Sequence, residues 1–318
     1  MSLKATKWWF DEMKWELIFL KTRQEIQGID LDVREAYNHS IIGVTALTLK
    51  RKNFFLDGLD FDFNIGYAIG RYGLCDKAMN RYDWDGNKLP PVSPYGGEQN
   101  NYPSDGNNHS KELTSKLNLE YTIDKHHGVN LNVYFDRNSL RPKDPLMDKA
   151  LGFQSNFPSR MNTLTLALSY DLTLFEGRFQ NAFTLKNYKF SSHSRSINVY
   201  SVSAPEPVSV SKSYFGFNDA MRYKLTNDWM VKASFNSEVR IPTNEELIGN
   251  GYSILASPAL KPERTSGVNV GMMYRHIKQN GGLVEIEFNG FYNQLKDMIR
   301  FTPDLIPTMA RYRNFGSV

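Results

Sequence analysis

The sequence predicts an all-β protein, an antiparallel transmembrane β-barrel to which this chain contributes about twelve strands. Three observations lead to this prediction. Apolar and polar residues alternate with a period of two along several segments. Several of these segments run for about 10 to 13 residues, whereas strands of globular proteins usually have about 5 or 6. Short turns and long polar loops also follow one another regularly, as they do in outer-membrane barrels.

The composition excludes several other classes of protein. In 318 residues the formal charge is only +4, which does not indicate a nucleic-acid partner. Mean hydropathy is −0.48, and there is no run of about 18 apolar residues that could form a transmembrane helix. The single cysteine, Cys75, excludes a disulfide framework and a cysteine-based zinc site. The aromatic content of 13% is high for so polar a chain, and strands with one lipid-facing side would explain it.

The alternation is clearest in six predicted strands. They lie within residues 59–70, 113–123, 129–135, 164–172, 229–239 and 284–292. In the fifth, Trp229, Val231 and Phe235 alternate with Lys232 and Glu238. A tilted strand needs about 9 to 11 residues to cross a bilayer, so these strands are long enough. We expect about twelve strands between residues 15 and 292, with residues 8–22 the least regular.

The connections between strands predict two different ends of the sheet. Tight turns are expected at residues 53–58, 124–128, 174–177, 225–228 and 275–282. Long polar loops are expected at residues 76–108, 137–160, 191–212 and 242–263. If neighbouring strands pair as antiparallel hairpins, every turn falls at one end and every loop at the other. Outer-membrane barrels have short periplasmic turns and long extracellular loops.

An ordered series of motifs occupies the last third of the chain. The strand through Phe235 ends in Arg240-Ile-Pro242, a Glu246-Leu247 turn follows, and Leu260-Lys261-Pro262-Glu263 precedes the strand that ends at Tyr274. Further matching runs end at Gly316. The series, which spans about 95 residues, resembles the barrel signature of TonB-dependent outer-membrane receptors. The runs 55–61 and 82–86 resemble such receptors from Bacteroidetes-type bacteria more loosely.

The resemblance implies a function for the complete protein. Members of this family have a 22-strand barrel with an N-terminal plug in its lumen, and they import a scarce large solute (siderophore, cobalamin, glycan or peptide) with energy delivered through TonB. The implied partners are TonB, the solute, outer-membrane lipid and, for Bacteroidetes-type receptors, a surface lipoprotein. Residues 1–3 are interpreted as an expression scar and residues 4–318 as part of the barrel, without the plug domain and the final strands.

The motif residues also have a purely physical interpretation. Thr243 and Glu246 are spaced as a capping box, which predicts a short helical turn after Pro242. Pro262 favours an extended Lys261 before the next strand. Arg240 and Glu263 lie at the ends of successive strands, where an ion pair between them could fix the base of the loop. These roles are architectural, so we favour them over contact with a ligand.

No catalytic, metal or cofactor site is predicted. The six histidines lack metal-ligand spacing, and no nucleophile–base pattern is present. The run Asp83-Trp-Asp-Gly-Asn87 is typical of a turn, because it lacks the glutamate of a calcium loop. Trp84 and Tyr95, in a loop rich in Asn, Asp and Gly, could stack on a sugar or another polar organic solute, or belong to the aromatic girdle at the membrane interface. Tyr67 and Tyr72, near a strand end, are assigned to the girdle.

The sequence also fits two alternative interpretations. A passive porin-like outer-membrane barrel would share the strands but not the motif series. A soluble β-rich glycan-binding protein would bury its apolar strand faces between two sheets. The positions of Trp229, Phe235 and Leu168 distinguish the two environments, because they face lipid in a barrel and a closed core in a sandwich.

Overall fold

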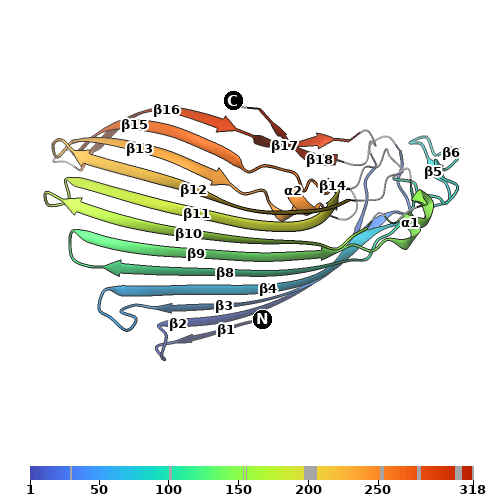
Figure 1. Ribbon diagram of the computed structural model, residues 1–318, viewed down its shortest axis with the longest axis horizontal. Helices are drawn as coiled ribbons and strands as arrows, with labels where there is room; N and C mark the ends of the chain where they lie inside the picture. Colours follow the sequence, from blue (N-terminus) through green and yellow to red (C-terminus); the bar gives the residue numbers. More distant parts are fainter. Residues whose placement is uncertain are drawn as a thin grey trace.

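The computed structural model contains one large antiparallel sheet, with short elements gathered at one end of it (Figure 1). It describes residues 1–28, 31–99, 102–152, 154, 156–196, 206–250, 254–277, 281–304 and 310–316. Twelve strands succeed one another across the sheet in chain order, and the short β7 pairs with β4 beside them. Each inner strand on this path therefore pairs with the strand before it and the strand after it, and β4 pairs in addition with β7 at its end.

The elements are as follows. The path consists of β1 (Ser2–Thr6), β2 (Glu12–Glu25), β3 (Tyr37–Arg51), β4 (Leu59–Asp76), β8 (Asn108–Thr122), β9 (His127–Arg141), β10 (Ser159–Leu174), β11 (Phe179–Ser196), β12 (Glu206–Lys224), β13 (Trp229–Arg240), β15 (Glu263–Ile277) and β16 (Leu283–Lys296). The short elements are β5 (Arg81–Tyr82), β6 (Lys88–Leu89), β7 (Ser104–Asp105), α1 (Pro145–Leu151), α2 (Asn244–Ile248), β14 (Ile254–Leu255), β17 (Met298–Pro303) and β18 (Ala310–Phe315). A separate small sheet joins β14, β18 and β17.

Most strands on the path are longer than predicted. Beyond β1, they run from 12 residues in β13 to 19 in β12. The difference arises at the loop ends, where pairing continues through polar residues that the sequence assigned to loops. Ser196 of β11 still pairs with Glu206 of β12, inside the loop expected at residues 191–212. Residues 197–205 of that expected loop lie outside the described residues.

The two faces of the sheet differ in polarity, as predicted. Register places Trp229, Tyr274 and Ile286 in one row across β13, β15 and β16, and places Lys232 with Asn289 on the opposite face. The first face is here called outward, and apolar side chains on it are exposed. These include Leu166, Leu168, Leu185, Phe215, Phe235, Val270 and Phe288. Leu168 is 51% and Phe235 45% exposed, so no second sheet covers this face at these positions.

Turns and loops segregate to opposite ends of the sheet (Figure 1). The turn between β10 and β11 occupies only four residues, and its Gly177 has a φ of +82°, a conformation that glycine adopts without strain. Between β8 and β9, the Asp124 carboxylate accepts the backbone N–H groups of His126 and His127. The predicted asymmetry of the connections is thus confirmed, although residues 278–280 of the last turn lie outside the described residues.

At the loop end, the inward face of the sheet becomes apolar. Leu140, Met161 and Phe190 from β9, β10 and β11 form a buried cluster with Leu247 and Ile248 of α2, Leu260 and Ile299. Tyr72 packs against this cluster, so its assignment to the aromatic girdle is wrong. Tyr67 and Tyr72 lie an odd number of residues apart on β4, so alternation places them on opposite faces of the sheet. Tyr67 lies outward, and Tyr72, which pairs with Asn108, lies inward. None of the helices in the described part of the chain is long and apolar enough to cross a bilayer.

Candidate functional site at the loop end

Arg240, the last residue of β13, joins the strand to the loop that follows. Its Nε lies 2.5 Å from a carboxylate oxygen of Glu263, which it faces across the β13–β15 ladder. Its terminal nitrogens lie 3.0 to 3.2 Å from both carboxylate oxygens of Glu246. Glu263 also accepts the backbone N–H of Ile299 at 2.6 Å. One guanidinium therefore holds two nearly buried carboxylates, the fork geometry for which arginine is suited.

The capping box predicted for residues 243–246 is present. The Thr243 hydroxyl accepts the N–H of Glu246, while the Glu246 carboxylate accepts the N–H of Thr243 at 2.7 Å. The box starts α2 immediately after the fully buried Pro242 and turns Leu247 into the apolar cluster, where it is 0% exposed. Glu246 thus serves both the helix cap and the Arg240 pair.

The Leu260–Glu263 motif forms the other side of the loop base. Leu260 is 7% exposed in the apolar cluster, and Pro262 is buried. The backbone N–H of Lys261 donates to the Asn314 side chain at 2.8 Å, and the Asn314 amide donates back to the Lys261 carbonyl. The eight motif residues named from the sequence thus lie around one loop base.

Trp84 and Tyr95 lie elsewhere in the loop region. Trp84 sits in the turn between β5 and β6 and is 59% exposed, and Tyr95 is 41% exposed with the Lys149 ammonium 5.5 Å from its ring centre. The turn is held by Asp83, whose carboxylate accepts the side-chain and backbone N–H groups of Asn87. These hydrogen bonds lower the pKa of Asp83. The run 83–87 is therefore a turn, as interpreted from the sequence.

Sequence reasoning missed the buried carboxylates that tie the loops together. Glu98, 3% exposed, accepts the backbone N–H groups of Arg34, Glu35 and Ala36. The carboxylate of Asp76, at the end of β4, accepts the backbone N–H groups of Glu98 and Gln99. Nothing in the local sequence marks these acids, because their partners are backbone groups far along the chain. They give the long loop after β4 a fixed attachment.

Asp144 is a third buried carboxylate of this kind. It caps α1 by accepting the N–H of Met147 at 3.0 Å, and it also accepts the Ser104 hydroxyl and the N–H of Asp105. It therefore connects the loop after β9 to the loop after β4. Among the described residues, no group of three or more His, Cys, Asp or Glu side chains is arranged to hold a metal ion.

Charged pairs line the inward face below the loops. Lys186 pairs with Glu238 from β11 to β13, and Lys232 pairs with Glu287 from β13 to β16. Each pair joins two strands that are separated by a third. The paired side chains therefore extend across the intervening strand and lie along the inward surface of the sheet. Amide side chains such as Asn269, which donates to Ser234 at 3.1 Å, lie between them. This surface is suited to water or a polar occupant.

A single sheet with long strands, an exposed apolar outward face and a polar inward face is a section of a transmembrane β-barrel. A soluble sandwich would cover its apolar face, so the alternative of a soluble glycan-binding protein does not fit. Residues 48–318 match the family described as TonB dependent receptor-like, beta-barrel, and the chain belongs to this family. Proteins of this family reside in the outer membrane of Gram-negative bacteria, and so does this one.

Solved structures of outer-membrane receptors share the fold. A double mutant of the hemophore receptor HasR of Serratia marcescens, in complex with its hemophore HasA and heme, superposes with a TM-score of 0.60 at 12% identity, over 96% of this chain and 48% of HasR. The FrpB iron transporter of Neisseria meningitidis gives 0.61 at 13% identity, over 96% and 46%. The ferric yersiniabactin uptake receptor FyuA of Yersinia pestis gives 0.52 at 15% identity, over 91% and 43%.

The chain spans about half the length of the solved structures it resembles. At such low identities the likeness concerns the fold alone. No protein with a curated description matches the chain.

Proposed function

We propose that this chain forms part of the barrel of a receptor that actively imports a scarce, large solute across the outer membrane. The proposal rests on the arrangement of loops and side chains at the loop end of the sheet. Long connections gather there, and those after β4, β9 and β13 are anchored by buried or nearly buried carboxylates in the described part of the chain, above an inward face lined with charged and amide side chains. Such an end can capture a solute outside the cell and pass it to a polar lumen. The siderophore, cobalamin, glycan and peptide classes all remain candidates for the solute.

We further propose that the functional barrel contains more strands than these and a plug. In this sheet β1 and β16 each pair on one side only among the described residues. An unpaired strand edge in the hydrocarbon core costs several kcal/mol for each unsatisfied backbone group, so a spanning barrel must close. The greater length of the related structures supports the same conclusion. By the family's pattern, the closed barrel would have 22 strands.

The proposed partner for energy is TonB, which acts on the plug segment in receptors of this family. A surface lipoprotein is a further proposed partner. This proposal rests on the resemblance of residues 55–61 and 82–86 to receptors from Bacteroidetes-type bacteria. No enzymatic activity is proposed. The eight motif residues around the loop base are proposed to be architectural, because their described contacts are with one another, with Asn314 and with the buried apolar cluster.

The experiment must separate active import from passive diffusion. Uptake is measured in cells with and without the gene that encodes the full-length protein, each in the presence and absence of TonB, across iron, cobalamin, glycan and peptide sources. For the proposed importer, uptake of one solute saturates at low concentration and requires both the receptor and TonB. Uptake that rises linearly with concentration and persists without TonB would identify a passive porin-like barrel instead.

Trp84 and Tyr95 are proposed to contact the solute, since both rings are exposed in the loop region. Once the panel has identified the solute, Trp84→Ala and Tyr95→Ala are expected to weaken its binding by about 0.5 to 1.5 kcal/mol each, the magnitude of an aromatic stacking contact beyond the area it buries. Phe55→Ala, which removes an exposed ring at the turn end, is the matched control. Equal binding by all three variants would assign the two loop rings to another role.

A further inference from the structure

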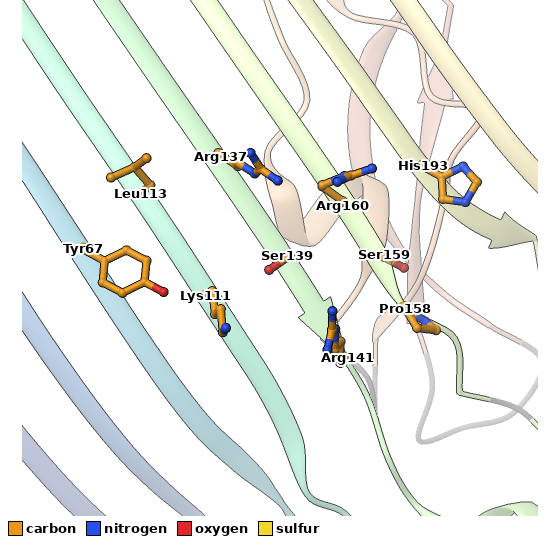
Figure 2. Close-up of a pocket in the computed structure, with 10 residues that line it drawn as sticks. All are labelled: Tyr67, Lys111, Leu113, Arg137, Ser139, Arg141, Pro158, Ser159, Arg160 and His193. Carbon is orange, nitrogen blue, oxygen red and sulfur yellow. The ribbon is translucent and has the colours of Figure 1, made fainter.

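A group of basic side chains lies on the outward face of the sheet, at the loop-side edge of its apolar band. Lys111, Arg137, Arg141, Arg160 and His193 are all exposed and line one hollow of about 490 Å³ together with Tyr67 and Ser139. They are here called the rim cluster. Figure 2 shows these side chains around the hollow, on neighbouring strands.

Register fixes the arrangement of the rim cluster. Lys111 of β8 pairs with Ser139 of β9, Ser139 with Arg160 of β10, and Arg160 with His193 of β11, so these four side chains form one row on one face. Arg137 and Arg141 lie two residues to either side of Ser139 on β9, and alternation therefore places them on the same face. Four neighbouring strands contribute to one basic surface.

Among the residues that the structure describes, no carboxylate pairs with the four cationic side chains of the rim cluster that carry a permanent charge. Lys111, Arg137, Arg141 and Arg160 take part in none of the ion pairs among the described residues. On the outward face of β8–β11, the described residues include no aspartate or glutamate. The inward face of the same strands, in contrast, carries Asp136. The separation of charge between the two faces leaves the rim cluster available to an external anion.

The position of the rim cluster relative to the apolar band indicates which anion it meets. On β10, Arg160 precedes the outward residues Leu164, Leu166 and Leu168, and on β9 Arg137 follows the outward Phe135. The basic residues thus begin where the apolar band ends, on the side of the long loops. In an outer-membrane barrel these loops are extracellular, so the cluster lies at the level of the outer-leaflet headgroups.

We propose that the rim cluster binds the phosphate groups of a phosphorylated glycolipid of the outer leaflet. Arginine and lysine are the usual ligands of phosphate, arginine in a bidentate manner, and Tyr67 and Ser139 add hydroxyl groups beside them. The acyl chains of the lipid continue along Leu164, Leu166 and Leu168 directly below. The site is separate from the solute pathway, because it lies on the opposite face of the sheet.

The test measures lipid binding by the full-length protein purified in detergent. The probe is diphosphoryl lipid A, and bound lipid is quantified by native mass spectrometry and by titration. The variant K111Q/R137Q/R160Q removes three charges from the cluster and keeps polar side chains. We expect binding to weaken about fivefold for each charge removed, the usual value of a basic residue at an anionic lipid surface. The control K88Q/K125Q/K224Q removes the same charge from exposed positions away from the hollow and should bind as the natural protein does.

Two further arms make the outcome decisive. Dephosphorylated lipid A should bind the natural protein as weakly as the triple variant binds the diphosphoryl form. Inorganic phosphate at the concentration of the lipid probe should leave lipid binding unchanged. If the triple variant does not fold, R137Q and R160Q are tested singly, with fivefold losses expected. Unchanged lipid binding by these variants, an equal loss in the control, or full displacement by inorganic phosphate would overturn the proposal. None of these readouts involves solute uptake, so the proposed import function is tested separately.

Discussion

Arg240 and Glu263 face each other across β13 and β15, with the Arg240 Nε 2.5 Å from a Glu263 carboxylate oxygen, at the point where the two strands leave the barrel wall. The 22 residues between them form one of the long loops and include α2. The pair closes this loop at its base. Because Glu263 also accepts the Ile299 N–H, it connects the loop base to β17.

Replacement of Glu263 by Gln should loosen this loop base. The change removes the charge that Arg240 neutralises while keeping one acceptor oxygen. We expect a loss of about 1 to 2 kcal/mol, reduced from the value of a fully buried pair because the Arg240 side chain is 42% exposed. Hydrogen exchange at the Ile299 amide and proteolysis within residues 241–262 measure it. The control Glu285→Gln acts on the exposed Arg275–Glu285 pair and should cost about 0 to 1 kcal/mol. Equal losses would contradict the role of Arg240–Glu263.

Truncation of Leu247 should open a cavity under the loop. Leu247 is 0% exposed between α2 and the inward face of the sheet, so Leu247→Ala should destabilise this region by about 2 to 5 kcal/mol. Exchange of the α2 amides reports it. Leu225→Ala, in the β12–β13 turn, removes the same atoms from a residue that is 52% exposed and should cost far less. Unchanged α2 protection in Leu247→Ala would show that the cluster does not hold the helix.

Glu98→Gln should release the segment between β2 and β3 from the long loop after β4. The glutamate accepts three backbone N–H groups, and charged acceptors contribute about 1.5 to 3 kcal/mol per hydrogen bond. The amides of Arg34, Glu35 and Ala36 should therefore exchange at least tenfold faster. The exposed neighbour Glu35 supplies the control, Glu35→Gln, which should leave these rates unchanged. Faster exchange in both variants would instead indicate a general effect of charge.

A charged residue should be costly on one face of β10 and tolerated on the other. Leu168 is outward and Ser169 inward, so Leu168→Arg places the guanidinium in lipid and Ser169→Arg places it in the lumen. Near the bilayer midplane an outward arginine costs about 2 to 4 kcal/mol. Denaturant unfolding of the full-length protein in lipid bilayers measures the difference. Equal costs for the two variants would refute the assignment of the faces.

The turn that presents Trp84 should loosen in acid. The Asn87 side-chain amide, followed by the Asn87 backbone N–H, lowers the pKa of Asp83 below its ordinary 3.8. A lowered pKa means that the carboxylate stabilises the turn above the unfolded value and that this contribution is lost as the pH falls through the folded value. Trp84 fluorescence should thus change at a midpoint below 3.8. Asp83→Asn cannot titrate, and a transition that survives in it would arise from another group.

Alternation of residue types predicted which side chains face lipid along most of each strand, because a period of two leaves little freedom once one face is apolar. The assignment of Tyr72 to the girdle failed because it rested on residue type near a strand end, whereas alternation from Tyr67 places Tyr72 on the inward face, which becomes apolar where α2 and β17 fold against it. The capping box at Thr243 followed from local spacing, and the Arg240–Glu263 pair followed from the position of both residues at the ends of successive antiparallel strands. The role of Glu98 did not, because its partners lie 62 to 64 residues away and are backbone groups that any sequence offers.

Along the twelve-strand path of the main sheet, the order of the strands follows the order of the chain. Adding or deleting two adjacent strands, with the turn that joins them, would therefore leave all other neighbours in place and require no rethreading of the chain. Both cut points would fall in loops at the same end of the sheet, where the chain already tolerates long connections. The topology thus offers a direct evolutionary route, by duplication or loss of a hairpin, between barrels of different circumference.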